Sequence, residues 1–265
     1  MYAFKYAKAQ SVDEAAKTLA ADGEAKLLAG GQSLVASMKL RLAQPSQLVD
    51  LGKVEALRYI KVEGGTVNIG AMTNHATVAA SAEVKKAIPA LAALAGDIGD
   101  RQVRNMGTIG GSVALNDPAA DYPAACVGLG ATIITTKRKI AADDFFLGMY
   151  ETALEPGEII TGFSFPVPKR AAYMKFKNPA SRFALVGVFV AETAQGPRVA
   201  VTGAGPGVFR VKDMEAALAK GFKPEAVASI KVSADNLNSD LHAQADYRAH
   251  LITVMAKRAV EKAIK

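Results

Sequence analysis

Two segments with adjacent glycines, Gly30-Gly31 and Gly110-Gly111, limit the folds open to this chain more than any other feature. The first follows a strand-like segment and precedes a helical one, and the second has the same setting less clearly. Adjacent glycines permit backbone conformations and close approaches that a Cβ atom would block. Backbone N–H groups in such a turn, together with a helix N-terminus, favour a phosphate or diphosphate. The loops therefore predict a nucleotide site, and the alternative is that each glycine pair forms only a tight turn.

The composition of the two loops narrows the kind of ligand. Neither loop contains the lysine of a P-loop, and neither has the G-x-G-x-x-G spacing of the Rossmann fingerprint. Neutral hydrogen bonds would therefore hold the ligand, which suits a permanently bound dinucleotide better than a hydrolysed triphosphate. A third glycine cluster, Gly203 to Gly207, contains Pro206, which has no N–H to donate. We expect this cluster to be a connecting turn.

The pattern of apolar residues predicts an α+β protein in three parts, residues 1–53, 54–166 and 167–265. Ser11 and Glu14 form a capping-box pattern at the start of the first helix. Gly64-Gly65 predicts a hairpin turn in the second part. The last part is expected to contain three antiparallel strands followed by helices, at Ala172 to Lys177, Ala184 to Glu192, Arg198 to Gly203 and finally Tyr247 to Ile264.

Three further predictions concern the second part. Residues 82–95 are predicted to form a helix, and Gly96 to Met106 is expected to be a polar loop. A short helical stretch is expected to start at Asp117-Pro118.

The cysteine and histidine content excludes a zinc site or an iron–sulfur cluster held by this chain alone. Cys126 is the single cysteine, and the three histidines are scattered. A disulfide framework, a zinc site or an iron–sulfur cluster would need more ligands than these. Cys126 lies in an apolar segment and is expected to be a buried, inert thiol. If the protein performs redox chemistry, its cofactor is organic or the metal is on another chain.

The remaining composition bears on partners and location. The net charge of +7 comes from dispersed Lys and Arg residues, of which Lys137 to Lys139 is the densest run. Without a basic stripe interleaved with aromatics, we expect no nucleic-acid partner, and the charge instead suits an acidic partner or an anionic cofactor. Apolar runs are strand-length and no secretory signal is recognisable, so we expect no membrane insertion and a cytoplasmic protein.

Several motifs together resemble one known family. Leu28 to Leu34, followed by Met38 to Leu42, closely resembles the first FAD loop of the medium subunit of aerobic carbon monoxide dehydrogenases. Arg104 to Ser112 and Asn116 to Asp121 are similar to the second FAD loop. Ser239 to Ala243 and the segments around Arg248 and Arg258 are similar to the C-terminal domain of those subunits. The flavin domain of xanthine dehydrogenase is a more distant relative.

The resemblance implies a fold and a set of contacts. The fold is of the vanillyl-alcohol-oxidase type, with two FAD-binding subdomains (1–53 and 54–166) and a C-terminal domain (167–265). Asp121 matches a carboxylate that accepts hydrogen bonds from hydroxyls of the flavin side, Ile160 an apolar contact near the ring, and Lys177 a lysine near the isoalloxazine, for which Lys175 is an alternative. The residues expected at the diphosphate and ribityl chain are Leu27, Leu28, Ala29, Gly30, Gly31, Gln32, Ser33, Leu34, Thr108, Ile109, Gly110, Gly111 and Ser112.

The resemblance also implies an activity. A large partner subunit with a molybdenum cofactor would oxidise the substrate, and a small partner with [2Fe–2S] clusters would pass electrons to FAD on this chain, in a dimer of heterotrimers. No residue of this chain is expected to transfer protons as a catalyst. The substrate and the terminal electron acceptor remain open. The alternative is a scaffold subunit of the same complex that binds no flavin.

Overall fold

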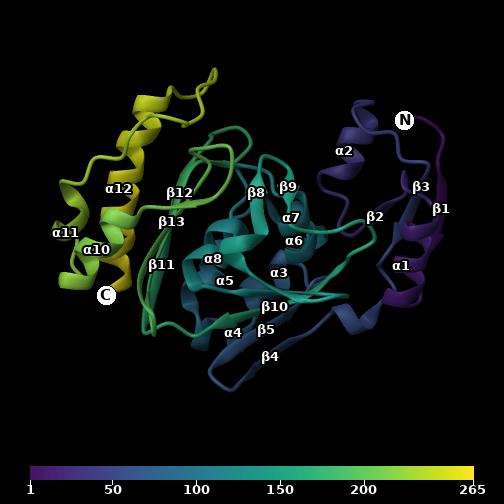
Figure 1. Ribbon diagram of the computed structural model, residues 1–265, viewed down its shortest axis with the longest axis horizontal. Helices are drawn as coiled ribbons and strands as arrows, with labels where there is room; N and C mark the ends of the chain where they lie inside the picture. Colours follow the sequence, from purple (N-terminus) through teal and green to yellow (C-terminus); the bar gives the residue numbers. More distant parts are fainter.

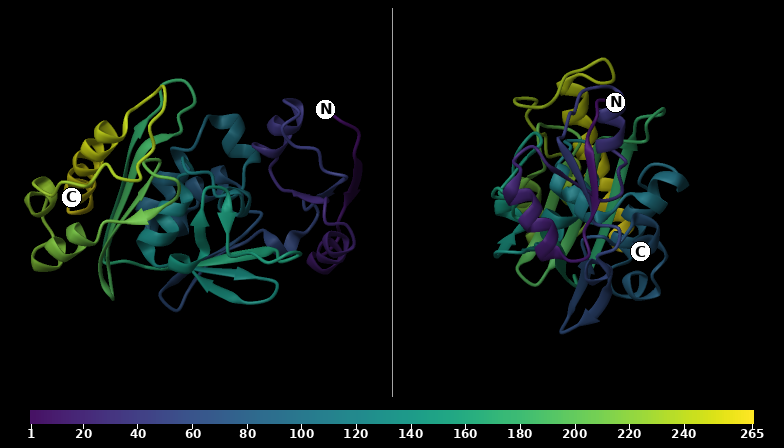
Figure 2. Two further views of the ribbon diagram at one scale, coloured as in Figure 1. Left: turned by 45° about the horizontal axis from the view of Figure 1, so that its top comes forward. Right: turned by 90° about the vertical axis from the view of Figure 1, so that its right-hand side faces the viewer.

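The computed structural model describes all 265 residues, which form a row of three parts with the chain termini at opposite ends (Figure 1). The N-terminal part (residues 1–53) and the C-terminal part (residues 167–265) lie on either side of the central part (residues 54–166) (Figures 1 and 2). Each part has its own main sheet. No helix is long and apolar enough to cross a lipid bilayer.

The N-terminal part is built on a small parallel sheet with strand order β1-β3-β2. Its first helix begins as predicted: the Ser11 hydroxyl accepts a hydrogen bond from the N–H of Glu14, and the Glu14 carboxylate accepts one from the N–H of Gln10. The elements are β1 (Lys5–Lys8), α1 (Val12–Ala21), β2 (Lys26–Leu28), α2 (Leu34–Lys39) and β3 (Gln47–Asp50).

The core of the N-terminal part is completed by the central part. Its cluster of eight buried apolar residues includes Leu57, Met72 and Ile159, which come from beyond residue 53. A sheet this small cannot bury enough apolar surface alone. Apolar burial therefore fixes the N-terminal part against the central part, and this contact positions the first glycine loop.

The central part combines an antiparallel sheet of order β4-β5-β10-β6-β7 with a group of short helices. The predicted Gly64-Gly65 hairpin joins β4 to β5, and both glycines have positive φ. The elements are η1 (Glu55–Leu57), β4 (Ile60–Glu63), β5 (Thr66–Gly70), α3 (His75–Ala80), α4 (Ala82–Ala87), α5 (Pro89–Gly96), α6 (Arg101–Met106), α7 (Ile109–Leu115), α8 (Tyr122–Leu129), β6 (Thr132–Thr135), β7 (Lys139–Ala141), α9 (Ala142–Phe145), β8 (Phe146–Gly148), β9 (Glu151–Thr152) and β10 (Ile160–Pro166).

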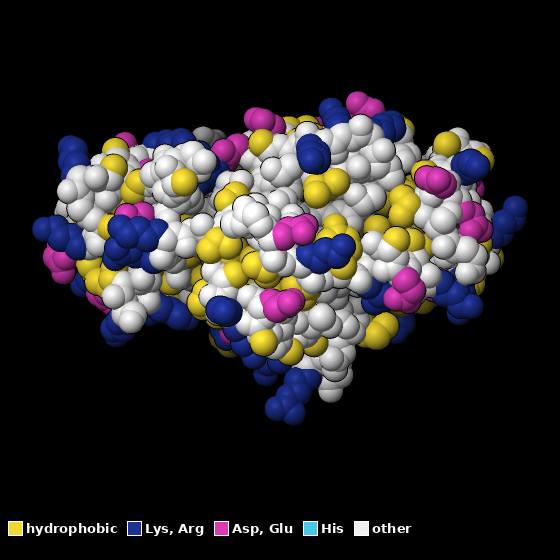
Figure 3. All heavy atoms as spheres, turned by 90° about the horizontal axis from the view of Figure 1, so that it is seen from below, with side chains coloured by type: hydrophobic (Ala, Val, Ile, Leu, Met, Phe, Trp, Pro, Cys, Tyr) yellow, Lys and Arg dark blue, Asp and Glu magenta, His cyan; other side chains and the backbone are white.

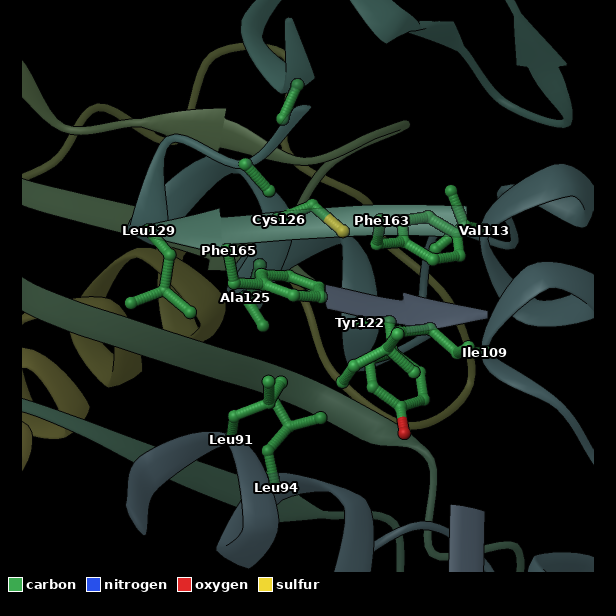
Figure 4. Close-up of a cluster of buried hydrophobic side chains, with 14 of the residues drawn as sticks. Leu91, Leu94, Ile109, Val113, Tyr122, Ala125, Cys126, Leu129, Phe163 and Phe165 are labelled. Atoms are coloured by element: carbon green, nitrogen blue, oxygen red, sulfur yellow. The ribbon is translucent and has the colours of Figure 1, made fainter. Parts of the chain in front are cut away.

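The main hydrophobic core lies between this sheet and the helices. Figure 4 shows Leu94 of α5, Val113 of α7, Cys126 of α8 and Phe163 of β10 among the side chains that fill it. Every residue of α8 is buried. Cys126 is buried, as expected, and burial raises the pKa of its thiol, which disfavours the reactive thiolate.

The C-terminal part corrects the expected sheet. The three predicted strands are present, and a fourth short strand extends them in the order β11-β12-β13-β14. The long helix α12 packs on one face of this sheet, and α8 contacts the other face. The elements are β11 (Arg170–Lys177), β12 (Ala184–Thr193), β13 (Gly196–Thr202), β14 (Phe209–Arg210), α10 (Lys212–Lys220), α11 (Glu225–Ala228) and α12 (Ala245–Ala263). Gly203 to Gly207 forms the connection to β14, as predicted.

Three local predictions were wrong. The expected single helix over residues 82–95 is two helices, because Pro89 has no N–H and disfavours helical geometry at Ile88. Arg101 to Met106, expected to be loop, is the helix α6, which the Asp100 carboxylate caps through the N–H of Val103. The helix expected to start at Asp117 starts at Tyr122.

The basic residues are dispersed on the face of the molecule that Figure 3 shows. On the face shown in Figure 3, Lys and Arg side chains lie singly or in small groups among acidic and apolar ones. Lys137 and Arg138 are paired with Glu155, and Arg138 also contacts Glu158. The net charge of +7 therefore does not produce a basic stripe on this face.

Candidate cofactor-binding site

A cavity of about 570 Å³ lies where the N-terminal and central parts meet. Both glycine loops line it, so the structure brings together two segments far apart in sequence. The expected site residues in its wall are Leu27, Ala29, Gly30, Gly31, Gln32, Ser33, Leu34, Thr108, Gly110, Gly111, Ser112, Asp121 and Ile160. Leu28, Ile109 and Lys177 are outside the lining. A volume of this size is typical of cofactor pockets.

The two loops touch each other directly at one end of this cavity. A Cβ atom on Gly30 would lie 2.6 Å from the Cα of Gly107 and would overlap the carbonyl oxygen of Met106. A Cβ atom on Gly111 would lie 3.6 Å from the Cβ of Ala29. Gly30 is therefore required for the two backbones to approach, whatever the cavity contains.

The first loop presents backbone donors with no partner in the chain. The N–H groups of residues 30–34 donate no hydrogen bond to any backbone or side-chain acceptor. The nearby carbonyl oxygen of Gly30 accepts a hydrogen bond of 3.1 Å from the side-chain amide Nε2 of Gln32. Gly31 has a φ of +71°, which turns the chain at this point. Successive unpaired N–H groups of this kind bind anionic oxygens.

The second loop differs from the first in its backbone N–H groups, which are already bonded. The expectation that both loops supply free N–H groups was therefore wrong. Ile109 N–H donates to Thr73 O at 3.1 Å, and Gly110 N–H donates to Ala71 O at 2.9 Å. Gly111 N–H donates to the hydroxyl of Thr108, and Ser112 N–H to the carbonyl of Thr108. These N–H groups already donate to acceptors within the central part, so the second loop lines the cavity without offering free donors at residues 109–112. The loop also follows helix α6, not a strand as expected.

Asp121 joins the cavity to the C-terminal part. Its side chain is nearly fully buried, and its Oδ1 accepts a hydrogen bond from the Tyr173 hydroxyl while its Oδ2 accepts one of 3.0 Å from Lys175 Nζ. Burial raises the pKa of Asp121, and the charge of Lys175 opposes this shift. Asp121 thus lines the cavity while each of its carboxylate oxygens accepts one hydrogen bond, from Tyr173 or from Lys175.

The structure distinguishes the two lysines of β11. The Lys175 side chain is completely buried, and its Nζ also donates to the carbonyl oxygen of Asp97 at 2.9 Å. The Lys177 side chain is 44% exposed and pairs with the Asp97 carboxylate. Neither lysine lines the cavity, and Lys175 is the one that contacts a cavity residue.

Several cavity residues were missed by sequence reasoning. His75, Tyr150, Arg182 and Phe183 all line the wall. Tyr150 is between the short strands β8 and β9, and Phe183 is in the turn between β11 and β12. The only sequence signal was indirect: both aromatic residues are in turns, where function concentrates. Their approach to the loops is set by tertiary packing.

The buried histidine of the cavity makes unfolding pH-dependent. Burial, reinforced by the charge of Arg104, lowers the pKa of His75 to about 4, against about 6.5 in an unfolded chain. The unfolded state therefore takes up a proton first, and the free energy of unfolding falls as the pH drops from 6.5 to 4. The loss from this group is on the order of 3 kcal/mol. Denaturant titrations at pH 7 and pH 4.5 would measure this drop in the free energy of unfolding. We expect the drop to be smaller in His75→Phe, because the variant has no imidazole to protonate. Equal losses in the variant and the original chain would contradict the assignment.

Comparison with known proteins shows the family to which the chain belongs. Residues 2–168 match the family model described as the FAD binding domain in molybdopterin dehydrogenase. The chain is 37% identical to the nicotine 6-hydroxylase medium subunit of Paenarthrobacter nicotinovorans, over 98% of this chain and 97% of that protein. It is 38% identical to the carbon monoxide dehydrogenase medium chain of Hydrogenophaga pseudoflava, over 98% of this chain and 96% of that one.

Solved structures give the same result. A chain of the carbon monoxide dehydrogenase from Hydrogenophaga pseudoflava superposes with a TM-score of 0.91, covering 99% of this chain and 98% of that one at 38% identity. Quinoline 2-oxidoreductase from Pseudomonas putida 86 gives a TM-score of 0.90 at 30% identity, covering 99% and 97%. The fold and site define a flavin-binding subunit of an oxidoreductase. The chain belongs to the family of FAD-binding medium subunits of molybdenum hydroxylases, which confirms the resemblance seen in its motifs.

Proposed function

We propose that the cavity between the glycine loops binds one FAD and that this chain transfers electrons within a molybdenum hydroxylase complex. The observation that carries the proposal is the run of unpaired N–H groups at residues 30–34, in a loop that lines the same cavity as the second loop. These groups supply neutral hydrogen bonds to a diphosphate. The match of residues 2–168 to an FAD-binding family supports this ligand over other dinucleotides.

The remaining cavity residues fit the other parts of FAD. Asp121 has acceptor capacity for ribityl hydroxyls beyond its bonds to Tyr173 and Lys175. Phe183 is an aromatic side chain in the wall, 47% exposed, and its ring can stack on the flat isoalloxazine. Ile160 supplies a buried apolar contact. Of the two lysines, Lys175 is the one that contacts a cavity residue, and it holds the Asp121 carboxylate in position.

Bound FAD would supply a carrier that takes up electrons singly and releases them singly or in pairs. The chain itself has no cluster of three His, Cys, Asp or Glu side chains suited to a metal ion. We place the molybdenum cofactor on a large partner subunit and the [2Fe–2S] clusters on a small one, in a cytoplasmic dimer of heterotrimers. The names of relatives as medium subunits or chains support such partners. Relatives are named for nicotine, carbon monoxide and glyceraldehyde, so the substrate stays open.

The test is the flavin content and reduction of the whole complex. The chain would be co-expressed with the large and small subunits of its complex. We expect one FAD released per copy of this chain on denaturation, and bleaching of the flavin absorption when substrate is added without an acceptor. A correctly assembled complex that releases no FAD on denaturation would overturn the proposal and favour the scaffold alternative.

A cavity variant separates the two alternatives further. The nearest side-chain atoms to a Cβ on Gly111 lie at 3.1 and 3.6 Å, in Thr108 and Ala29, and Gly111 lines the cavity. Gly111→Leu would therefore fill space that the proposal assigns to FAD. Loss of electron transfer with the complex still assembled is expected. Unchanged electron transfer would indicate that the cavity is not used.

A further inference from the structure

One polar side chain in the cavity wall has no partner within the chain. His75 is the first residue of α3, which Asn74 caps, and its backbone N–H donates to Gly107 O at 3.0 Å. The side chain is only 4% exposed and lines the cavity. Its position is therefore fixed by the same contact that holds the start of the second loop.

The imidazole of His75 is buried without hydrogen bonds. Its Nδ1 is inaccessible to solvent and has no partner, and Nε2 lies beside Gly107, where a Cβ atom would come within 2.6 Å of it. Glycine at position 107 is thus needed for the ring to occupy this wall. Most buried polar groups in folded proteins are paired, and an unpaired one destabilises the fold unless a bound molecule completes it.

The surroundings of the ring favour the neutral imidazole. Arg104 is the charged group that acts on it, and the guanidinium of Arg104 is bound to the carbonyl oxygens of Ile98 and Gly99. The other ring nearby belongs to Tyr122, at 5.4 Å between centroids. A neutral imidazole carries one N–H donor and one nitrogen acceptor. It can therefore bond to a carbonyl, hydroxyl or phosphate oxygen, or to a ring N–H.

We propose that His75 is a cofactor-binding residue, whose neutral imidazole hydrogen-bonds a polar atom of FAD. This inference rests on the proposed function, because it requires FAD in the cavity. The inaccessible Nδ1 lowers the stability of the flavin-free protein and cannot reach the cavity, so Nε2, which has no hydrogen-bond partner in the chain, is the atom that would meet FAD. His75 therefore contributes to the affinity for FAD, because its ring forms a hydrogen bond with FAD that it does not form with the protein.

The test is His75→Phe, which keeps an aromatic ring of similar shape and removes both nitrogens. In the full chain freed of flavin, we expect a higher melting temperature than that of the original chain. The dissociation constant for FAD, measured by quenching of flavin fluorescence, is expected to rise about tenfold, the equivalent of one hydrogen bond. His75→Gln, which keeps a donor and an acceptor, should lose less affinity.

Tyr122→Phe is the matched control. The Tyr122 hydroxyl is also buried without a partner, but Tyr122 is outside the cavity lining. This variant should raise the melting temperature of the flavin-free chain and leave the FAD affinity unchanged.

Two results would overturn the role of His75. One is FAD affinity equal to that of the original chain in His75→Phe, and the other is a lower melting temperature or failure to fold, which would show that the nitrogens serve the fold. Failure of the proposed function is a different result, because the original chain itself would then bind no FAD.

Discussion

Gly30→Ala is expected to separate the two glycine loops and to remove most of the bound flavin. The added Cβ would overlap the carbonyl oxygen of Met106 and lie 2.6 Å from the Cα of Gly107. Both are backbone atoms, so no side-chain rotation relieves the overlap, and the N-terminal part must move. Overpacking of this kind costs about 1–3 kcal/mol. Denaturant titration would measure the loss of stability, and the ratio of FAD to protein after purification would measure the loss of binding.

Gly23→Ala is the matched control for this substitution. Gly23 belongs to the same part of the chain, and nothing lies within 4 Å of the position that its Cβ would take. We expect the control to keep its flavin and to change stability by a few tenths of a kcal/mol at most. Equal flavin content in Gly30→Ala and Gly23→Ala would show that contact between the loops does not shape the cavity.

Lys175→Met is expected to produce the largest loss of stability. The substitution removes the ammonium group next to the buried carboxylate of Asp121, and it also removes a donor to the carbonyl oxygen of Asp97. Removing one partner of a buried ion pair costs about 3–5 kcal/mol, because the remaining charge has lost both water and its counter-ion. The free energy of unfolding from denaturant titration at pH 7 is the measurement.

Lys177→Met serves as its control, two residues along the same strand. The Lys177 side chain is 44% exposed, so its pair with Asp97 is screened by solvent. Such surface pairs contribute about 0–1 kcal/mol. Similar losses in the two variants would contradict the distinction between a buried and a surface lysine. A loss of stability in Lys177→Met alone would show that Lys177, and not Lys175, is the stabilising lysine.

Local signals in the sequence predicted much of the fold. The capping box at Ser11, the Gly64-Gly65 hairpin and the long strands of the C-terminal part depend on neighbouring residues alone, and the structure contains all of them. The glycine loops were also recognisable, because glycine is favoured where two backbones approach closely. Their meeting at Gly30 and Gly107 shows that need directly.

Other features depend on tertiary contacts and left little trace in the sequence. Strand β14 has only two residues and pairs with β13 because the chain returns past it. His75 looks like an ordinary helical residue until Gly107 is placed against its ring. The difference between the two loops in free N–H groups arises from bonds to Ala71 and Thr73, which no local pattern reveals.

Hydrogen–deuterium exchange of the full chain with and without FAD tests the central claim most directly. The N–H groups of residues 30–34 have no acceptor in the protein, whereas those of residues 109–112 are already bonded. We predict that FAD slows exchange strongly in peptides covering Ala29 to Leu34 and much less in peptides covering Ile109 to Ser112. Unchanged exchange at Ala29 to Leu34 in a chain that binds FAD would place the diphosphate elsewhere and contradict the account.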